Sequence, residues 1–133
     1  MAAAVHCERI VAPHDLRERT RLFALAVRSF CRRLPSTTEA QEAASQLRRA
    51  ANSVRSNYRA SRKGRSRAEF EAKLGIVAEE ADEWLDWLEY LRDAQIRHDE
   101  VLLDEANQLT KIFVAALKTA RKNTTRLKNL PNS

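Results

Sequence analysis

The chain has 133 residues and a formal net charge of +6, with 24 lysines and arginines against 18 acidic residues. This length suits one domain with a modest core, and the positive charge favours nucleic acid over acidic metabolites as a partner. Only two glycines and three prolines interrupt a helix-favouring composition, so we predict an all-α fold. No apolar run is long enough for an export signal or a membrane span, so we expect a cytoplasmic protein with no membrane partner.

Apolar residues recur at helical spacing in four segments, and each segment begins at a capping signal. The predicted helices span residues 15–34, 38–62, 66–94 and 99–123. Asp15 and Asp99 open the first and last of them, while Ser36 and Ser66 each start a capping box that ends in glutamate three residues later. Residues 1–12 form a loose lead-in, and residues 124–133 are predicted to be a flexible tail.

Each predicted helix carries one strong apolar stripe, and the connecting segments are short. The third helix shows this most clearly, because its stripe runs from Phe70 to Leu91 in alternating steps of four and three. Four such helices joined by short loops predict an antiparallel up-down four-helix bundle over residues 13–123, with no second domain.

The third and fourth predicted helices also carry apolar residues outside these stripes. An apolar arc close to half of a helix circumference indicates a second contact surface, so we predict a homo-oligomer formed through these helices. The alternative is a slightly apolar solvent-exposed surface. The candidate interface residues are Ile76, Leu85, Trp87, Leu103, Ile112 and Leu117.

A catalytic or metal site has little support in the sequence. The histidines fall in predicted lead-in or loop positions, and Cys7 and Cys31 lack metal-ligand spacing, so both are expected to be reduced thiols. Carboxylates from Asp82 to Asp93 share one face of the third helix, where a solvated or ion-paired surface is favoured over a metal site. We therefore expect a protein that is not an enzyme and has no metal or cofactor.

The strongest functional signal is a basic block, Arg48 to Arg67, that contains no acidic residue. At about 100° per residue, its helical arginines share one face of the second helix, and a second arginine stripe from Arg17 to Arg32 follows the first helix. The candidate nucleic-acid-binding residues are Arg48, Arg49, Arg55, Arg59, Arg62, Lys63, Arg65, Arg67, Arg17, Arg21, Arg28, Lys118, Arg121 and Lys122. The alternative is that acids of the third helix neutralise these cations inside or between subunits.

The segment from Ser53 to Leu91 resembles the four-helix-bundle proteins encoded in 23S ribosomal RNA intervening sequences. The resemblance extends from about Asp15 to Asn123, and it implies a bundle that commonly assembles as a homopentameric ring. A related branch comprises the accessory variability proteins of diversity-generating retroelements, which bind nucleic acid and associate with a reverse transcriptase. This chain departs from the family pattern at Arg55 and Ala60, where a small residue and an acid are usual.

Three hypotheses remain open at this stage. The first is a non-enzymatic homo-oligomer that binds the backbone of structured RNA or an RNA–DNA hybrid, with RNA favoured. The second is a protein–protein adaptor, for example the accessory subunit of a reverse transcriptase. The third is a structural oligomer in which the basic second helix pairs with the acidic third helix.

Overall fold

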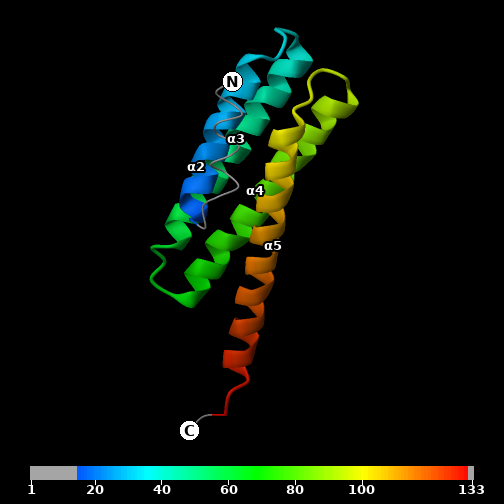
Figure 1. Cartoon of the computed structure of the whole chain (residues 1–133). Coiled ribbons are helices and arrows are strands. Elements are labelled where there is room, and N and C mark those ends of the chain that lie inside the picture. Colours follow the sequence, from blue (N-terminus) through cyan, green and yellow to red (C-terminus); the bar gives the residue numbers. More distant parts are fainter. Residues whose placement is uncertain (1–14, 132–133) are drawn as a thin grey trace.

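Four α-helices make up the computed structural model of the chain, which describes residues 15–131. They are α2 (Leu16–Arg32), α3 (Thr38–Ser61), α4 (Arg67–Asp93) and α5 (Glu100–Lys128). Successive helices run in opposite directions, and the described residues contain no strand (Figure 1). The predicted all-α four-helix bundle is therefore confirmed.

Local side-chain hydrogen bonds explain where the helices begin. The hydroxyl of Ser66 accepts the N–H of Glu69 at 3.1 Å, and the Glu69 carboxylate accepts the N–H of Arg65 at 3.3 Å, which completes a capping box at α4. At α3 the cap is Thr37 rather than the predicted Ser36. The four N-caps are Asp15, Thr37, Ser66 and Asp99.

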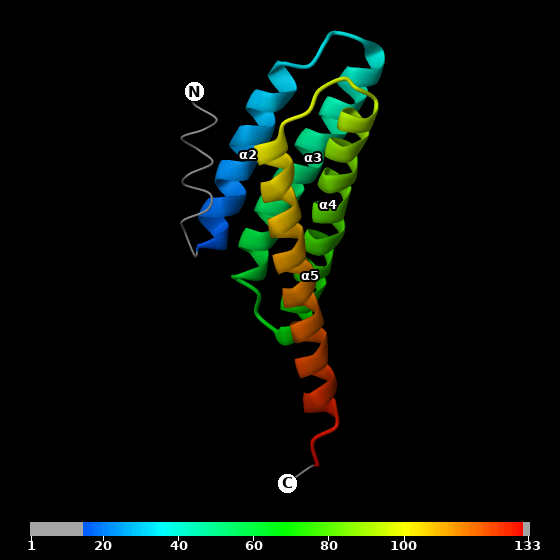
Figure 2. The ribbon, with the colours of Figure 1, turned by 45° about the vertical axis from the view of Figure 1, so that its right-hand side comes forward.

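The last helix is longer than the sequence pattern predicted. We expected it to end at 123 before a flexible tail, but α5 continues to Lys128 and extends past the end of the other helices (Figures 1 and 2). Thr124 donates a hydrogen bond to Glu71 of α4 at 2.8 Å, and basic residues in the last turn suit the negative end of the helix dipole. The predicted lead-in, residues 1–12, lies outside the described residues.

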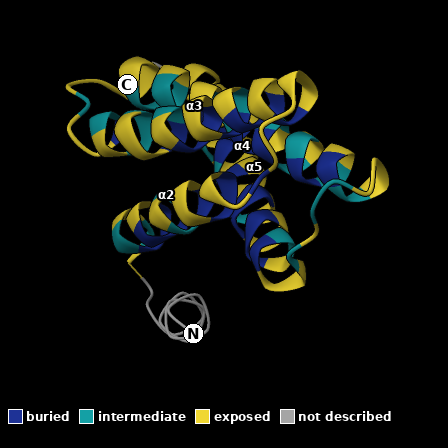
Figure 3. Ribbon diagram, turned by 90° about the horizontal axis from the view of Figure 1, so that it is seen from above, coloured by how far each residue is buried: buried dark blue, intermediate teal, exposed yellow. Residues whose placement is uncertain are grey.

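The core lies where the buried stripes of the four helices meet, and most outward-facing positions are exposed (Figure 3). Alanines dominate the buried stripe of α3, which lets α4 pack closely against it. Trp84 is fully buried at the centre, with its ring 4.3 Å from that of Phe23. Its indole N–H donates to the Thr110 hydroxyl at 3.0 Å, so the largest buried side chain has its polar atom satisfied.

Candidate nucleic-acid interface

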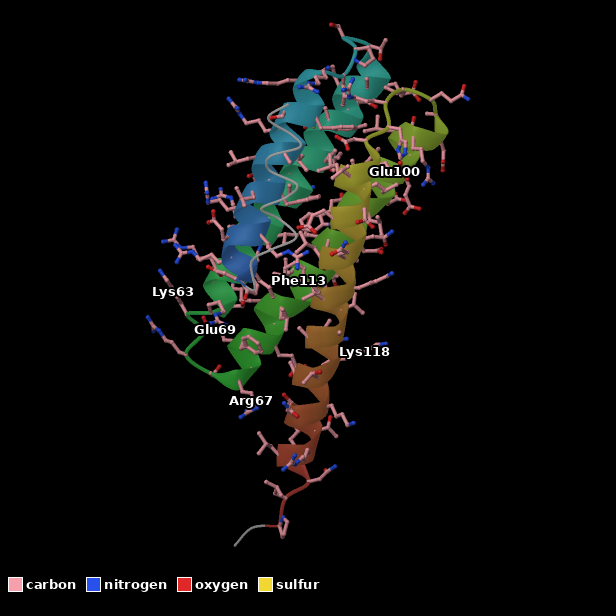
Figure 4. The ribbon with its side chains drawn as sticks, in the orientation of Figure 1. Lys63, Arg67, Glu69, Glu100, Phe113 and Lys118 are labelled. Carbon is pink, nitrogen blue, oxygen red and sulfur yellow. The ribbon has the colours of Figure 1, made fainter. Side chains whose placement is uncertain are left out.

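All fourteen basic residues predicted to bind nucleic acid are exposed. They do not form one continuous surface, because they come from all four helices and from the loop between α3 and α4. Figure 4 illustrates the spread: Lys63 and Arg67 lie near that loop, whereas Lys118 projects from α5.

A groove between α2 and α3 brings two of the predicted arginine stripes together. The two helices are antiparallel neighbours, and each contributes arginines at intervals of three, four or seven residues, which places them along one face. The groove has a volume of about 580 Å³. Its lining comprises Arg21, Ala24, Leu25, Arg28 and Arg32 from α2, and Arg48, Asn52 and Arg55 from α3.

The arginines of this groove are mostly not neutralised within the chain. Arg21 pairs with Glu18 at 2.7 Å, and the hydrogen bond and charge of that carboxylate raise the pKa of Arg21. Within residues 15–131, the other groove arginines form no ion pair with a carboxylate. Each wall of the groove therefore presents two guanidinium groups without a carboxylate partner among the described residues, Arg28 and Arg32 on α2 and Arg48 and Arg55 on α3, and groups of this kind have the charge and shape that suit an anion.

A second basic hollow, of about 470 Å³, lies further along the same pair of helices. It is lined by Asp15, Leu16 and Arg17 from the start of α2, and by Tyr58, Arg59, Arg62 and Lys63 from the end of α3. The Tyr58 ring is half-buried against Phe113, 5.5 Å between ring centroids. The candidate residues of α2 and most of those of α3 therefore border one of two adjacent hollows.

The remaining candidates lie elsewhere. Arg49 faces α4, where its charge opposes the rise in the pKa of Glu80 that burial causes. Arg67 and Arg121 border a different groove between α4 and α5, and Arg121 lies 3.9 Å from Glu71. These cations are exposed, but they do not share a surface with the two arginine rows.

Three residues that line the main groove were not among the predicted binding residues. Arg32 continues the α2 stripe but was absent from the candidate residues, and Asn52 lies one turn from both Arg48 and Arg55. Leu25 is 40% exposed on the groove wall. Helical spacing alone was the signal that pointed to Arg32 and Asn52, whereas Leu25 is recognisable only once the neighbouring helix is in place.

An acidic groove with aromatic residues lies between α3 and α4. It is lined by Glu39, Glu42, Asp86, Trp87, Glu89, Tyr90, Asp93 and Ala94. The Tyr90 hydroxyl donates to Glu39, and this bond raises the pKa of Tyr90. Across the described residues, no ion pair joins an α3 arginine to an α4 carboxylate, so these acids do not neutralise the basic stripe within the chain.

The six residues predicted to form an oligomer interface differ in how far they are buried. Ile76 is 37% exposed beside Gly75, where an added Cβ would meet no atom within 4 Å. Four others, Leu85, Trp87, Leu103 and Ile112, are half-buried. Leu117 belongs to the bundle core, contrary to its predicted place outside the stripe, because the turn of α5 at that position faces the other helices.

Metal-ligating groups, the buried thiol and the apolarity of the helices are the features of residues 15–131 that bear on metal binding, nucleophilic reactivity and membrane insertion. The described part of the chain holds no group of three or more His, Cys, Asp or Glu that could hold a metal ion. Burial raises the pKa of the Cys31 thiol to about 11, so it is protonated at neutral pH and a poor nucleophile. No described helix combines the length and apolarity needed to cross a membrane.

Comparison with known proteins identifies the family. The family model of the 23S rRNA-intervening sequence protein matches residues 14–118, which cover nearly the whole bundle. The chain belongs to this family. No curated protein matches this family member.

A solved structure shares the fold of this 23S rRNA-intervening sequence protein family member. It is the crystal structure of a protein with unknown function from the S23 ribosomal protein family of Bacteroides thetaiotaomicron VPI-5482. The two superpose with a TM-score of 0.70 at 23% sequence identity, over 78% of this chain and 99% of the other. At this level of identity, the likeness extends to the fold alone.

Proposed function

We propose that this protein is a non-enzymatic, homo-oligomeric nucleic-acid-binding protein whose preferred ligand is structured RNA or an RNA–DNA hybrid. One observation carries the proposal: an arginine row on α2 faces an arginine row on α3 across one groove, and four of its five arginines lack a carboxylate partner in the described chain. Phosphate is the anion that planar guanidinium forks bind in bidentate fashion.

The lining of the groove favours contacts to the backbone over contacts to bases. Asn52 is its one amide side chain, and no aromatic ring lines it. Sequence-specific recognition requires hydrogen bonds or stacking with base edges and faces, whereas phosphate contacts carry little sequence information. Binding is therefore expected to be strongly salt-dependent and weakly sequence-dependent. The family name, which refers to 23S rRNA intervening sequences, supports RNA as the ligand.

Self-association would strengthen this binding because each added copy contributes another basic groove. The support for an oligomer is the groove between the start of α4 and the end of α5, which has a volume of about 740 Å³ and is lined by Ala72, Gly75, Ile76 and Leu127 among others. The family resemblance favours a homopentamer.

The test is a charge reversal of the exposed α3 row. A variant with Arg48, Arg55, Arg59 and Arg62 all changed to Glu is titrated against a labelled RNA hairpin, with affinity followed by fluorescence anisotropy. We expect affinity to fall by at least about a hundredfold at low salt. Each arginine that binds a phosphate releases a counterion from the RNA, which favours binding, and this gain is lost at every reversed position.

A matched control reverses four exposed cations of α5, namely Lys111, Lys118, Lys122 and Arg126. This variant carries the same net charge, and we expect its affinity to fall much less. Because Lys118 and Lys122 were themselves candidate residues, equal losses of affinity in the two variants would show that the α3 row binds RNA no more strongly than other exposed cations do. Unchanged affinity in the α3 variant would refute the proposal.

A protein–protein adaptor, such as a reverse-transcriptase accessory subunit, is the second candidate function. The acidic groove between α3 and α4 favours it, because the Trp87 and Tyr90 rings, 5.7 Å apart, lie among five carboxylates there. Such a surface repels nucleic acid and suits a cationic protein segment. In that case the isolated protein would bind RNA weakly, and a genomic neighbour encoding a reverse transcriptase would identify the partner.

A further inference from the structure

The two basic hollows between α2 and α3 lie one after the other along the same two helices, and together they are called the α2–α3 track below. Arg48, Asn52, Arg55, Arg59 and Arg62 follow one another at steps of four, three, four and three along α3, so they share a face of that helix. Since α2 runs antiparallel to α3, the order of the hollows along both helices is the same: Arg32 and Arg48 border one end, and Arg17 and Arg62 border the other.

The length of this track suits several phosphates. α2 has 17 residues, which at about 1.5 Å per residue gives roughly 25 Å. At the axial spacing of about 3.4 Å per phosphate along one strand of a duplex, this corresponds to about seven phosphates, and to fewer in an extended single strand. The track is therefore long enough for a short oligonucleotide rather than for one isolated anion.

The width of the track decides which form of nucleic acid enters it. Packed helices lie about 8–10 Å apart, so the arginine rows on α2 and α3 approach a ligand from both sides of a narrow trough. The major groove of a duplex alone is about 12 Å wide, so a whole duplex cannot enter between the two rows. A single backbone can, and it then has guanidinium groups on both sides.

The wall of the trough adds an apolar contact. Ala24 and the exposed Leu25 lie among the arginines of the larger hollow. Riboses and base faces of a single strand are available for such a contact, whereas in a duplex the bases are stacked and paired. A duplex resting on the rims of the trough would leave Leu25 in water.

We infer that the α2–α3 track binds single-stranded nucleic acid, with the strand's phosphates held between the two arginine rows and its sugars against Leu25. The inference rests on the proposed function and specifies its ligand: in a structured RNA the segment that enters the track is a loop or an unpaired end, and in an RNA–DNA hybrid it is a single-stranded overhang rather than the paired region. Binding to the track does not require stacking, since Tyr58 is the sole aromatic residue that borders either hollow.

The experiment places a carboxylate on the wall of the track and, as a control, on another helix. The variants are Leu25→Glu and Val114→Glu, which have the same net charge and replace side chains that are 40% and 37% exposed. Leu25→Gln removes the apolar side chain without adding a charge. Each protein is titrated with a labelled single-stranded uridine octamer and with a blunt RNA duplex of eight base pairs, and circular dichroism confirms the helical content.

We expect the wild-type protein to bind the octamer more tightly than the duplex. Leu25→Glu should weaken octamer binding by at least about tenfold, Val114→Glu by less than about threefold, and Leu25→Gln by an intermediate factor. A double variant, Arg28→Gln with Arg55→Gln, measures counterion release. The salt slope is the change in the logarithm of affinity with the logarithm of salt concentration, and each lost phosphate contact lowers it by about 0.7 for a single strand. The double variant should therefore reduce the salt slope of octamer binding by about 1.4. The double variant Lys111→Gln with Arg126→Gln, whose exposed cations lie on α5 and are not among the candidate binding residues, should leave that slope nearly unchanged.

Two results would overturn the inference while leaving the proposed function in place. One is equal weakening of octamer binding by Leu25→Glu and Val114→Glu, and the other is tighter wild-type binding to the blunt duplex than to the octamer. If the wild-type protein binds neither the octamer, the duplex nor the RNA hairpin, the proposed function and this inference both fail.

Discussion

The ion pair between Arg19 of α2 and Glu105 of α5 gives a sharp prediction about stability. Its nitrogen and oxygen atoms meet at two points, Nη2 to Oε1 at 2.6 Å and Nε to Oε2 at 3.2 Å. The side chains are only 11% and 5% exposed. Burial raises the pKa of Glu105, while the Arg19 guanidinium opposes that rise by stabilising the carboxylate. The variant Glu105→Ala would leave a buried guanidinium without its partner.

The expected cost of this variant follows from its burial. Removing one partner of a buried ion pair typically destabilises a protein by about 3–5 kcal/mol, because the remaining charge stays desolvated. For a domain of this size, 1 kcal/mol corresponds to about 4 °C in melting temperature, so the midpoint should fall by about 12–20 °C. Since α2 also forms one wall of the arginine track, we expect RNA affinity to fall at temperatures where the variant begins to melt.

Urea and thermal denaturation followed by circular dichroism at 222 nm measure this cost. The matched control is Arg21→Ala, which breaks a pair of similar length, 2.7 Å, whose side chains are 52% and 42% exposed. An exposed pair contributes about 0–1 kcal/mol, so this control should remain nearly as stable as the wild type. The double variant Arg19→Met with Glu105→Leu should recover most of the missing stability, because apolar side chains of similar size remove both charges.

Equal destabilisation by Glu105→Ala and Arg21→Ala would refute the reasoning, since it would show that burial does not set the cost. A double variant as unstable as Glu105→Ala would show that the destabilisation comes from packing rather than from the unpaired charge.

Three further predictions concern other parts of the molecule. Thr110→Val removes the hydroxyl that accepts the Trp84 indole N–H, and it should cost about 1–3 kcal/mol in urea denaturation. Burial first, and then nearby acids, raise the pKa of Glu80 above its ordinary value of 4.5. The protonated Glu80 side chain therefore stabilises the fold at low pH, and this stabilisation is lost as the pH rises through the folded-state pKa. The variant Glu80→Gln, which cannot ionise, should make the decline of stability above pH 4.5 less steep. Ile76→Glu should convert the proposed oligomer to a 15.2 kDa monomer in native mass spectrometry without loss of helix.

Each of these predictions has a contradicting result. An unchanged urea midpoint in Thr110→Val would mean that the indole finds an equivalent acceptor. A pH profile of Glu80→Gln that coincides with that of the wild type would assign the acid dependence to other groups. For the oligomer, Val101→Glu is the control, because Val101 is exposed at the start of α5, whereas the groove that contains Ile76 involves the end of α5. Equal dissociation by both variants would refute an interface at Ile76.

Features that depend on neighbouring residues were predictable from the sequence. Helix starts at Asp15, Ser66 and Asp99 follow from hydrogen bonds that span two or three residues, and these signals act whatever the rest of the chain does. The end of α5 was not predictable in the same way. Its last turns are held partly by the bond from Thr124 to Glu71, 53 residues away.

The buried ion pair shows the same limit within the core. Arg19 lies four residues before Phe23 on the apolar stripe of α2, and Glu105 lies between Leu102 and Leu109 on that of α5. A charged residue within an apolar stripe indicates that its side chain is buried and needs a partner of opposite charge. The stripe does not indicate which residue on another helix is that partner. The partners are 86 residues apart, so only the packing of α2 against α5 decides the pairing.

The sequence by itself determined four amphipathic helices and the solvent exposure of the arginine stripes, because helical periodicity and charge fix which side of a helix faces water. It did not determine that the stripe of α2 and the stripe of α3 face the same groove. That depends on the rotation of each helix about its axis when the buried faces pack, and Arg28 and Arg55 become parts of one surface only in the folded bundle. The tertiary structure thus turned two separate basic stripes into one candidate binding site.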